Sequence, residues 1–63
     1  MPFVSIALMA GRPEEQKQAV ARRLSEIMKE EMGVAPEHLW IRFDDTQPHD
    51  WFTGPSSEAE ISK

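Results

Sequence analysis

Residues 2–17, which read PFVSIALMAGRPEEQK, decide the fold because an alternating apolar segment runs directly into a helix start. In residues 2–9 one face would hold Val4, Ile6 and Leu8, and the other Phe3, Ser5, Ala7 and Met9. This period of two predicts a β-strand. Since both faces carry apolar side chains, we expect the strand to be covered on two sides.

A helix is predicted from Pro13 to about Met32. Gly11 ends the strand, and a proline suits the first helical turn because its missing N–H needs no partner there. Glu14 and Glu15 follow, where the helix dipole favours acids. One apolar stripe recurs at helical spacing: Val20, Leu24, Ile27 and Met28. Gly33 is a typical C-terminal stop.

A second strand is predicted from Leu39 to about Asp45. Leu39, Ile41 and Phe43 would face the helix stripe, and Trp40, Arg42 and Asp44 would face away. The order strand, helix, strand predicts a right-handed crossover and a parallel pair. In the tail, residues 51–53 would form one arm of a short hairpin. The prediction is therefore an α/β fold, a β-α-β protomer with a C-terminal hairpin, as a single domain over residues 1–63.

The short length predicts a homo-oligomer. A chain of 63 residues is marginal alone, and small scaffolds usually add disulfides, a metal or further copies. There are no cysteines, and His38 and His49 stand too far apart to recruit a metal. The sheet face away from the helix would expose Phe3, Ala7, Met9 and Trp40, and such a patch normally marks an interface.

Charge and hydropathy argue against nucleic acid and membranes as partners. The formal net charge is −4 and the basic residues are dispersed, which argues against nucleic-acid binding. No apolar run reaches the length of a membrane span, and the N-terminus does not resemble a signal peptide. We expect a cytoplasmic protein that contacts neither nucleic acid nor membrane.

Pro2 is the sharpest chemical feature. Removal of Met1 would leave a free secondary amine, whose ammonium form is disfavoured by an apolar pocket and by nearby arginine cations. A neutral amine near physiological pH is suited to proton abstraction. The alternative is that Pro2 simply begins an edge strand.

The strand opening at Pro2, the segment Gly11–Lys17, the turn Gly33–Pro36 and the later aromatic Trp51 together resemble the 4-oxalocrotonate tautomerase family over nearly the whole chain. The resemblance implies a cofactor-independent isomerase that tautomerises small 2-oxo acids or dienols, acts in aromatic compound degradation and assembles as a homohexamer. Pro2 would be the general base, and Arg12 would bind a substrate carboxylate, to which its planar fork is suited. Trp51 would form an apolar wall. The alternatives are a solvated turn residue for Arg12 and ordinary packing for Trp51.

The chain also departs from the family pattern. Well-studied members carry an arginine on the second strand that stabilises developing enolate charge. Ungapped alignment places Trp40 at that position, and Arg42 stands two residues further along the same face; both are candidate substrate-binding residues. The family's C-terminal glycine pair is also altered, since Pro55 follows Gly54. Arg42 would either replace that arginine in substrate binding or pair with Asp44 or Asp45 on the surface. These departures leave two alternatives to a tautomerase open. One is a hydratase or dehalogenase within the superfamily, and the other is a non-catalytic oligomeric scaffold.

Overall fold

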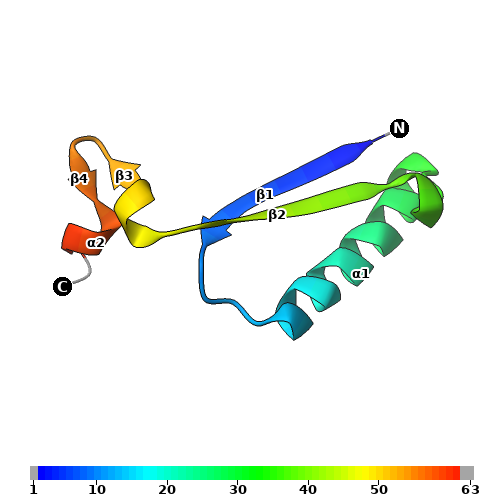
Figure 1. Cartoon of the computed structure of the whole chain (residues 1–63). Coiled ribbons are helices and arrows are strands. Elements are labelled where there is room, and N and C mark those ends of the chain that lie inside the picture. The colour runs from blue at the N-terminus through cyan, green and yellow to red at the C-terminus, as the bar shows by residue number, and fades with distance from the viewer. Residues whose placement is uncertain (1, 62–63) are drawn as a thin grey trace.

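The computed structural model describes residues 2–61, which follow the predicted strand, helix, strand order (Figure 1). Strand β1 spans Phe3–Met9, helix α1 spans Glu14–Met32 and strand β2 spans Trp40–Thr46. Short 3-10 turns η1, Pro36–His38, and η2, Pro48–Asp50, flank β2. The tail holds strands β3, Phe52–Thr53, and β4, Ser56–Ser57, followed by the four-residue helix α2, Glu58–Ile61.

The two long strands pair in parallel, as predicted. Phe3 stands opposite Trp40, and the register continues to Met9 opposite Thr46. Helix α1 lies on one side of this pair and leaves the other side bare (Figure 1). Val4, Ile6 and Leu8 are half-buried toward the helix, whereas Phe3 and Trp40 are 61% and 56% exposed on the bare face. The expected cover on both sides is therefore absent from a single protomer.

The ends of α1 follow from local chemistry. Pro13 has an extended backbone and stands at the N-cap, one residue before the helix rather than in its first turn. Its carbonyl accepts hydrogen bonds from the N–H groups of Gln16 and Lys17. At the other end Gly33 adopts a left-handed conformation with φ 66°, and its N–H donates to the Lys29 carbonyl. Glycine adopts this conformation without steric cost, which ends the helix as predicted.

The C-terminal hairpin forms despite the unusual Gly54-Pro55 turn. Thr53 pairs with Ser56 in an antiparallel ladder, so the connecting loop has two residues. Gly54 has φ 61°, as the first position of such a loop often requires. Helix α2 was not predicted, although Ser57 caps its start: the Ser57 hydroxyl accepts a hydrogen bond from the Glu60 N–H and donates one to the Glu60 carboxylate.

A lone protomer has almost no interior. Among residues 2–61 no apolar side chain is buried, and Val20 and Ile27 of the predicted helix stripe remain exposed. The radius of gyration is 15.0 Å, against about 11 Å for a compact domain of this length. The accessible surface is 5042 Å², against about 4100 Å² for a compact monomer of this mass. The excess of about 900 Å² is the size of one side of a standard protein interface.

One ion pair ties the helix to the sheet, because Lys17 Nζ lies 2.7 Å from Asp45 Oδ2. The pair is partly exposed, so we expect Asp45→Asn to lower the free energy of unfolding by only about 0.5–1 kcal/mol. Salt screens such pairs, so the difference from the parent should shrink near 1 M sodium chloride. Denaturant unfolding at low and high salt checks this expectation. A loss of several kcal/mol that salt does not reduce would contradict it.

Candidate functional site

Pro2 lies at the start of β1, beside the start of β2. Its carbonyl accepts a hydrogen bond from the Trp40 N–H at 3.2 Å, which extends the parallel ladder by one step. The residue is half-buried. The ladder therefore fixes Pro2 at one end of the sheet. The expected removal of Met1 concerns a residue outside the described range.

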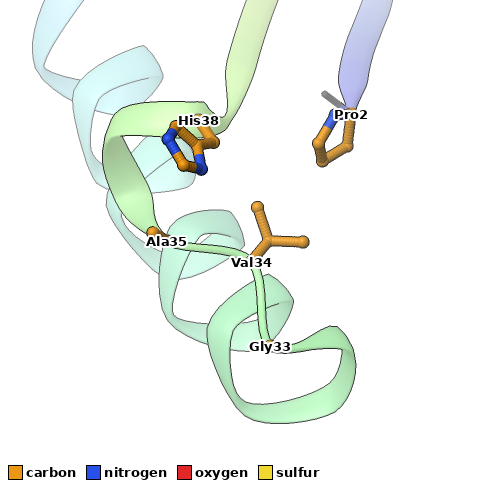
Figure 2. Close-up of a pocket in the computed structure, with 5 residues that line it drawn as sticks. All are labelled: Pro2, Gly33, Val34, Ala35 and His38. Atoms are coloured by element: carbon orange, nitrogen blue, oxygen red, sulfur yellow. The ribbon is translucent and has the colours of Figure 1, made fainter.

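Pro2 borders a hollow of about 620 Å³ between the sheet end and the turn that follows α1 (Figure 2). Its lining residues are Pro2, Gly33, Val34, Ala35 and His38. The left-handed Gly33 turns the chain back toward the sheet. Val34 then lies below Pro2, and Ala35 lies below His38 on the other side of the hollow (Figure 2). Four of the five residues offer only apolar side chains or backbone, and an apolar wall disfavours the charged form of an amine.

His38 also lines this hollow, although it was not among the site residues predicted from the sequence. It is exposed, and its ring stands across the hollow from the Pro2 ring (Figure 2). A signal was present in the sequence, because the starts of two parallel strands meet at one edge of a sheet. A residue just before the second strand therefore lies near a residue just before the first.

Arg12 lies at the opposite end of β1. It borders a second, smaller hollow of about 200 Å³ next to the start of α1, where Ile6, Leu8, Val20 and Phe43 supply apolar walls. Its Nη1 is 3.5 Å from Gln16 Oε1, and the side chain is otherwise exposed. The guanidinium is thus available to an anion.

One protomer does not bring Pro2 and Arg12 together. The seven residues of β1 separate them, which at a rise of about 3.3 Å per residue amounts to about 23 Å. A small acid does not reach from one to the other. The two residues can share a substrate only if they belong to different copies of the chain.

Trp40 and Arg42 stand on the bare sheet face. Arg42 Nε donates to Asp44 Oδ1 at 2.8 Å, which is the surface pairing that the sequence left open as an alternative. The second oxygen of the Asp44 carboxylate accepts from the Ser5 hydroxyl at 3.4 Å. The Asp44 carboxylate therefore partly neutralises the charge of Arg42. The Arg42 side chain remains exposed on the bare sheet face.

Trp51 lies between η2 and β3, beyond the end of β2 that is remote from Pro2 (Figure 1). Its carbonyl accepts a short hydrogen bond of 2.7 Å from the Glu58 N–H, which anchors the hairpin to α2. The side chain is half-buried. As with Arg12, the structure does not place Trp51 beside Pro2 of the same chain.

Within residues 2–61, no three His, Asp or Glu side chains are grouped so that they could hold a metal ion. No helix in the same range is long and apolar enough to cross a membrane.

Comparison with known proteins decides the family. A family profile described as "Tautomerase enzyme" matches residues 1–54, which is most of the chain. The chain belongs to the tautomerase family. The predicted resemblance and the predicted β-α-β fold with its C-terminal hairpin are thereby confirmed.

The relatives of this family member include characterised proteins. A 2-hydroxymuconate tautomerase from Comamonas testosteroni is 29% identical over 63 residues, the full length of both chains. A 4-oxalocrotonate tautomerase isozyme structure from Methylibium petroleiphilum superposes with a TM-score of 0.86 at 32% identity, covering 98% of this chain and 100% of that one. A heterohexamer 4-oxalocrotonate tautomerase from Chloroflexus aurantiacus superposes with a TM-score of 0.84 at 30% identity, covering 97% and 98%.

Proposed function

We propose that this chain is a cofactor-independent isomerase that catalyses keto-enol tautomerisation of small 2-oxo acids or dienols such as 2-hydroxymuconate. Family membership and the 2-hydroxymuconate tautomerase among its relatives support the reaction class. The observation that carries the mechanism is the position of Pro2 at the rim of an apolar hollow. A catalytic amine needs such surroundings.

Pro2 would act as the general base once Met1 is removed. An α-amino group titrates near ~7.7–8.0 in model compounds, and apolar surroundings favour its neutral form. The neutral amine takes a proton from the enol hydroxyl or the α-carbon and returns it to another carbon of the substrate. The amine ends the cycle as it began, so the reaction needs no co-reactant.

Arg12 would bind a substrate carboxylate from a neighbouring copy of the chain. Its guanidinium offers two parallel donors, and the adjacent start of α1 adds favourable potential for an anion. The distance between Pro2 and Arg12 in one chain and the missing protomer core both favour a shared site in an assembly. We propose a homohexamer, the assembly size that the Chloroflexus relative also has in hetero-oligomeric form.

The other predicted site residues would complete this shared site. Trp40 and Trp51 would supply apolar walls, and Arg42 would supply a second cation on the bare sheet face. Because Asp44 already pairs with Arg42, we assign Arg42 a smaller share of carboxylate binding than Arg12.

Activity itself is tested by ultraviolet-monitored ketonisation of 2-hydroxymuconate and phenylenolpyruvate, using protein whose mass shows that Met1 is absent. Turnover well above the buffer rate is expected. If the mature protein turns over neither substrate but dehalogenates a haloacrylate, the hydratase or dehalogenase alternative holds instead. If it turns over none of the three, the scaffold alternative holds.

Mixing two impaired variants, assayed at a substrate concentration well below the KM of Arg12→Ala, tests whether the site is shared. We expect Arg12→Ala to raise KM for carboxylate substrates by about 10- to 100-fold, because one charge-assisted contact worth roughly 1.5–3 kcal/mol is lost. In hybrids refolded from equal amounts of Pro2→Ala and Arg12→Ala chains, roughly one site in four should combine an intact Pro2 with an intact Arg12. Hybrid activity well above that of either variant is therefore expected. Hybrids no more active than the separate variants would mean that both residues of a site come from one chain.

A further inference from the structure

The backbone of His38 is held in a defined position at the Pro2 hollow. It ends the 3-10 turn η1, in which its own N–H donates to the Ala35 carbonyl at 2.9 Å and the Leu39 N–H donates to the Pro36 carbonyl at 3.2 Å. Val34 and Ala35 form the floor between His38 and Pro2 (Figure 2). Among the described residues that line the hollow, His38 alone has a polar side chain.

The proposed reaction needs a hydrogen-bond donor at this place. When Pro2 removes a proton, negative charge develops on the substrate oxygen, and a fixed donor aimed at that oxygen stabilises the transition state. The strand arginine expected for this purpose is replaced by Trp40. Arg42 faces the bare side of the sheet and is engaged by Asp44. Neither Arg12 nor Arg42 of the same chain lines the hollow that holds Pro2, so His38 is the polar side chain that the Pro2-bearing chain itself supplies there.

We propose that His38 donates a hydrogen bond from its imidazole to the substrate oxygen that gains negative charge while Pro2 moves the proton; this inference rests on the proposed tautomerase function. The imidazole carries at least one N–H in either protonation state, so it can donate in both. The proton travels from substrate to the Pro2 nitrogen and back to a substrate carbon, and His38 keeps its own proton throughout. His38 thus touches the substrate and stabilises charge without entering the proton transfer.

The test compares four single variants of the mature protein with the parent in the ketonisation assay: His38→Ala, His38→Gln, His49→Ala and Pro2→Ala. His38→Ala removes the donor and should lower kcat roughly 100-fold, the cost of one such donor elsewhere. Its KM should stay within about threefold, because the oxygen is charged in the transition state and not in the ground state. His38→Gln keeps an N–H donor of similar reach and should recover most of kcat. His49→Ala, at the other histidine, which is exposed in η2, should match the parent.

Pro2→Ala separates failure of this inference from failure of the proposed function. If Pro2→Ala loses activity and His38→Ala keeps the parental kcat, the role of His38 is wrong and the proline mechanism stands. If the mature parent itself does not ketonise either substrate, the proposed function is wrong. If the parent is active and Pro2→Ala keeps parental activity, the proline mechanism is wrong. In both cases the role of His38 falls with it. An equal loss of kcat in His38→Ala and His38→Gln, with assembly unchanged in sedimentation, would also overturn the proposal. Such a result would mean that the shape of the imidazole ring matters and that its N–H donor does not.

Discussion

Replacing Pro2 by alanine should lower kcat/KM for ketonisation of 2-hydroxymuconate by about 10²- to 10⁴-fold, the usual contribution of a positioned general base. Alanine retains an N-terminal amine, but it lacks the ring that borders the hollow and fixes the direction of the nitrogen. The proton is then taken by a base that is free to move. Steady-state kinetics over several pH values measure the loss, with the mature mass of each protein confirmed.

Pro55→Ala is the matched control for this substitution. Pro55 lies in the exposed hairpin turn, outside the hollow that holds Pro2. The control should retain kcat/KM within about twofold of the parent, as expected of a surface change. A Pro2→Ala protein as active as the Pro55→Ala protein would remove Pro2 from the mechanism.

Phe3→Asp should prevent assembly and with it folding. Phe3 is 61% exposed on the bare sheet face opposite Trp40, and no apolar side chain in residues 2–61 is buried by the protomer alone. If this face is covered only in the oligomer, the substitution removes a buried aromatic ring, worth about 3–5 kcal/mol per protomer, and places a charge in an apolar interface. That loss is a large share of a normal folding free energy of about 5–15 kcal/mol.

Sedimentation velocity and far-ultraviolet circular dichroism check this prediction together. The parent should sediment as one oligomer and melt cooperatively, whereas Phe3→Asp should show neither behaviour at micromolar concentration. Arg22→Asp, which adds the same acid on the exposed side of α1, should leave the oligomer intact. A folded, monomeric Phe3→Asp protein would contradict the account, because it would mean that the protomer is stable without its partners.

The long elements were predictable because their signals are local. The alternation in residues 3–9, the helical spacing from Val20 to Met28 and the stop at Gly33 each reflect periodicity or a backbone conformation that one stretch of sequence encodes. The strand pairing followed from the element order. The short helix α2 was not predicted because residues 56–63 are mostly polar, although the capping pair Ser57 and Glu60 marks its start.

The site was harder to predict because it depends on which ends of the elements meet. The sequence predicted that Pro2 and Arg12 act on the same substrate. The strand between them places them at opposite ends of a protomer. His38 was not predicted as a site residue because it stands in no recognisable catalytic spacing along the chain. Its proximity to Pro2 arises from the parallel register and the turn at Gly33. In the proposed assembly, neighbouring copies would cover Val20 and Ile27, which are exposed in a single protomer.

The central claim is that the secondary amine of Pro2 is the base. It is tested most directly by converting this amine into an amide while the Pro2 ring stays in place. The 63-residue chain is short enough for total synthesis with and without Met1, and the two products differ at Pro2 only in whether its nitrogen is an amine or an amide. Refolded under the same conditions, the form without Met1 should ketonise 2-hydroxymuconate, and the form that retains Met1 should do so at least about 10²-fold more slowly. Equal rates in two folded, equally assembled proteins would contradict the proline mechanism.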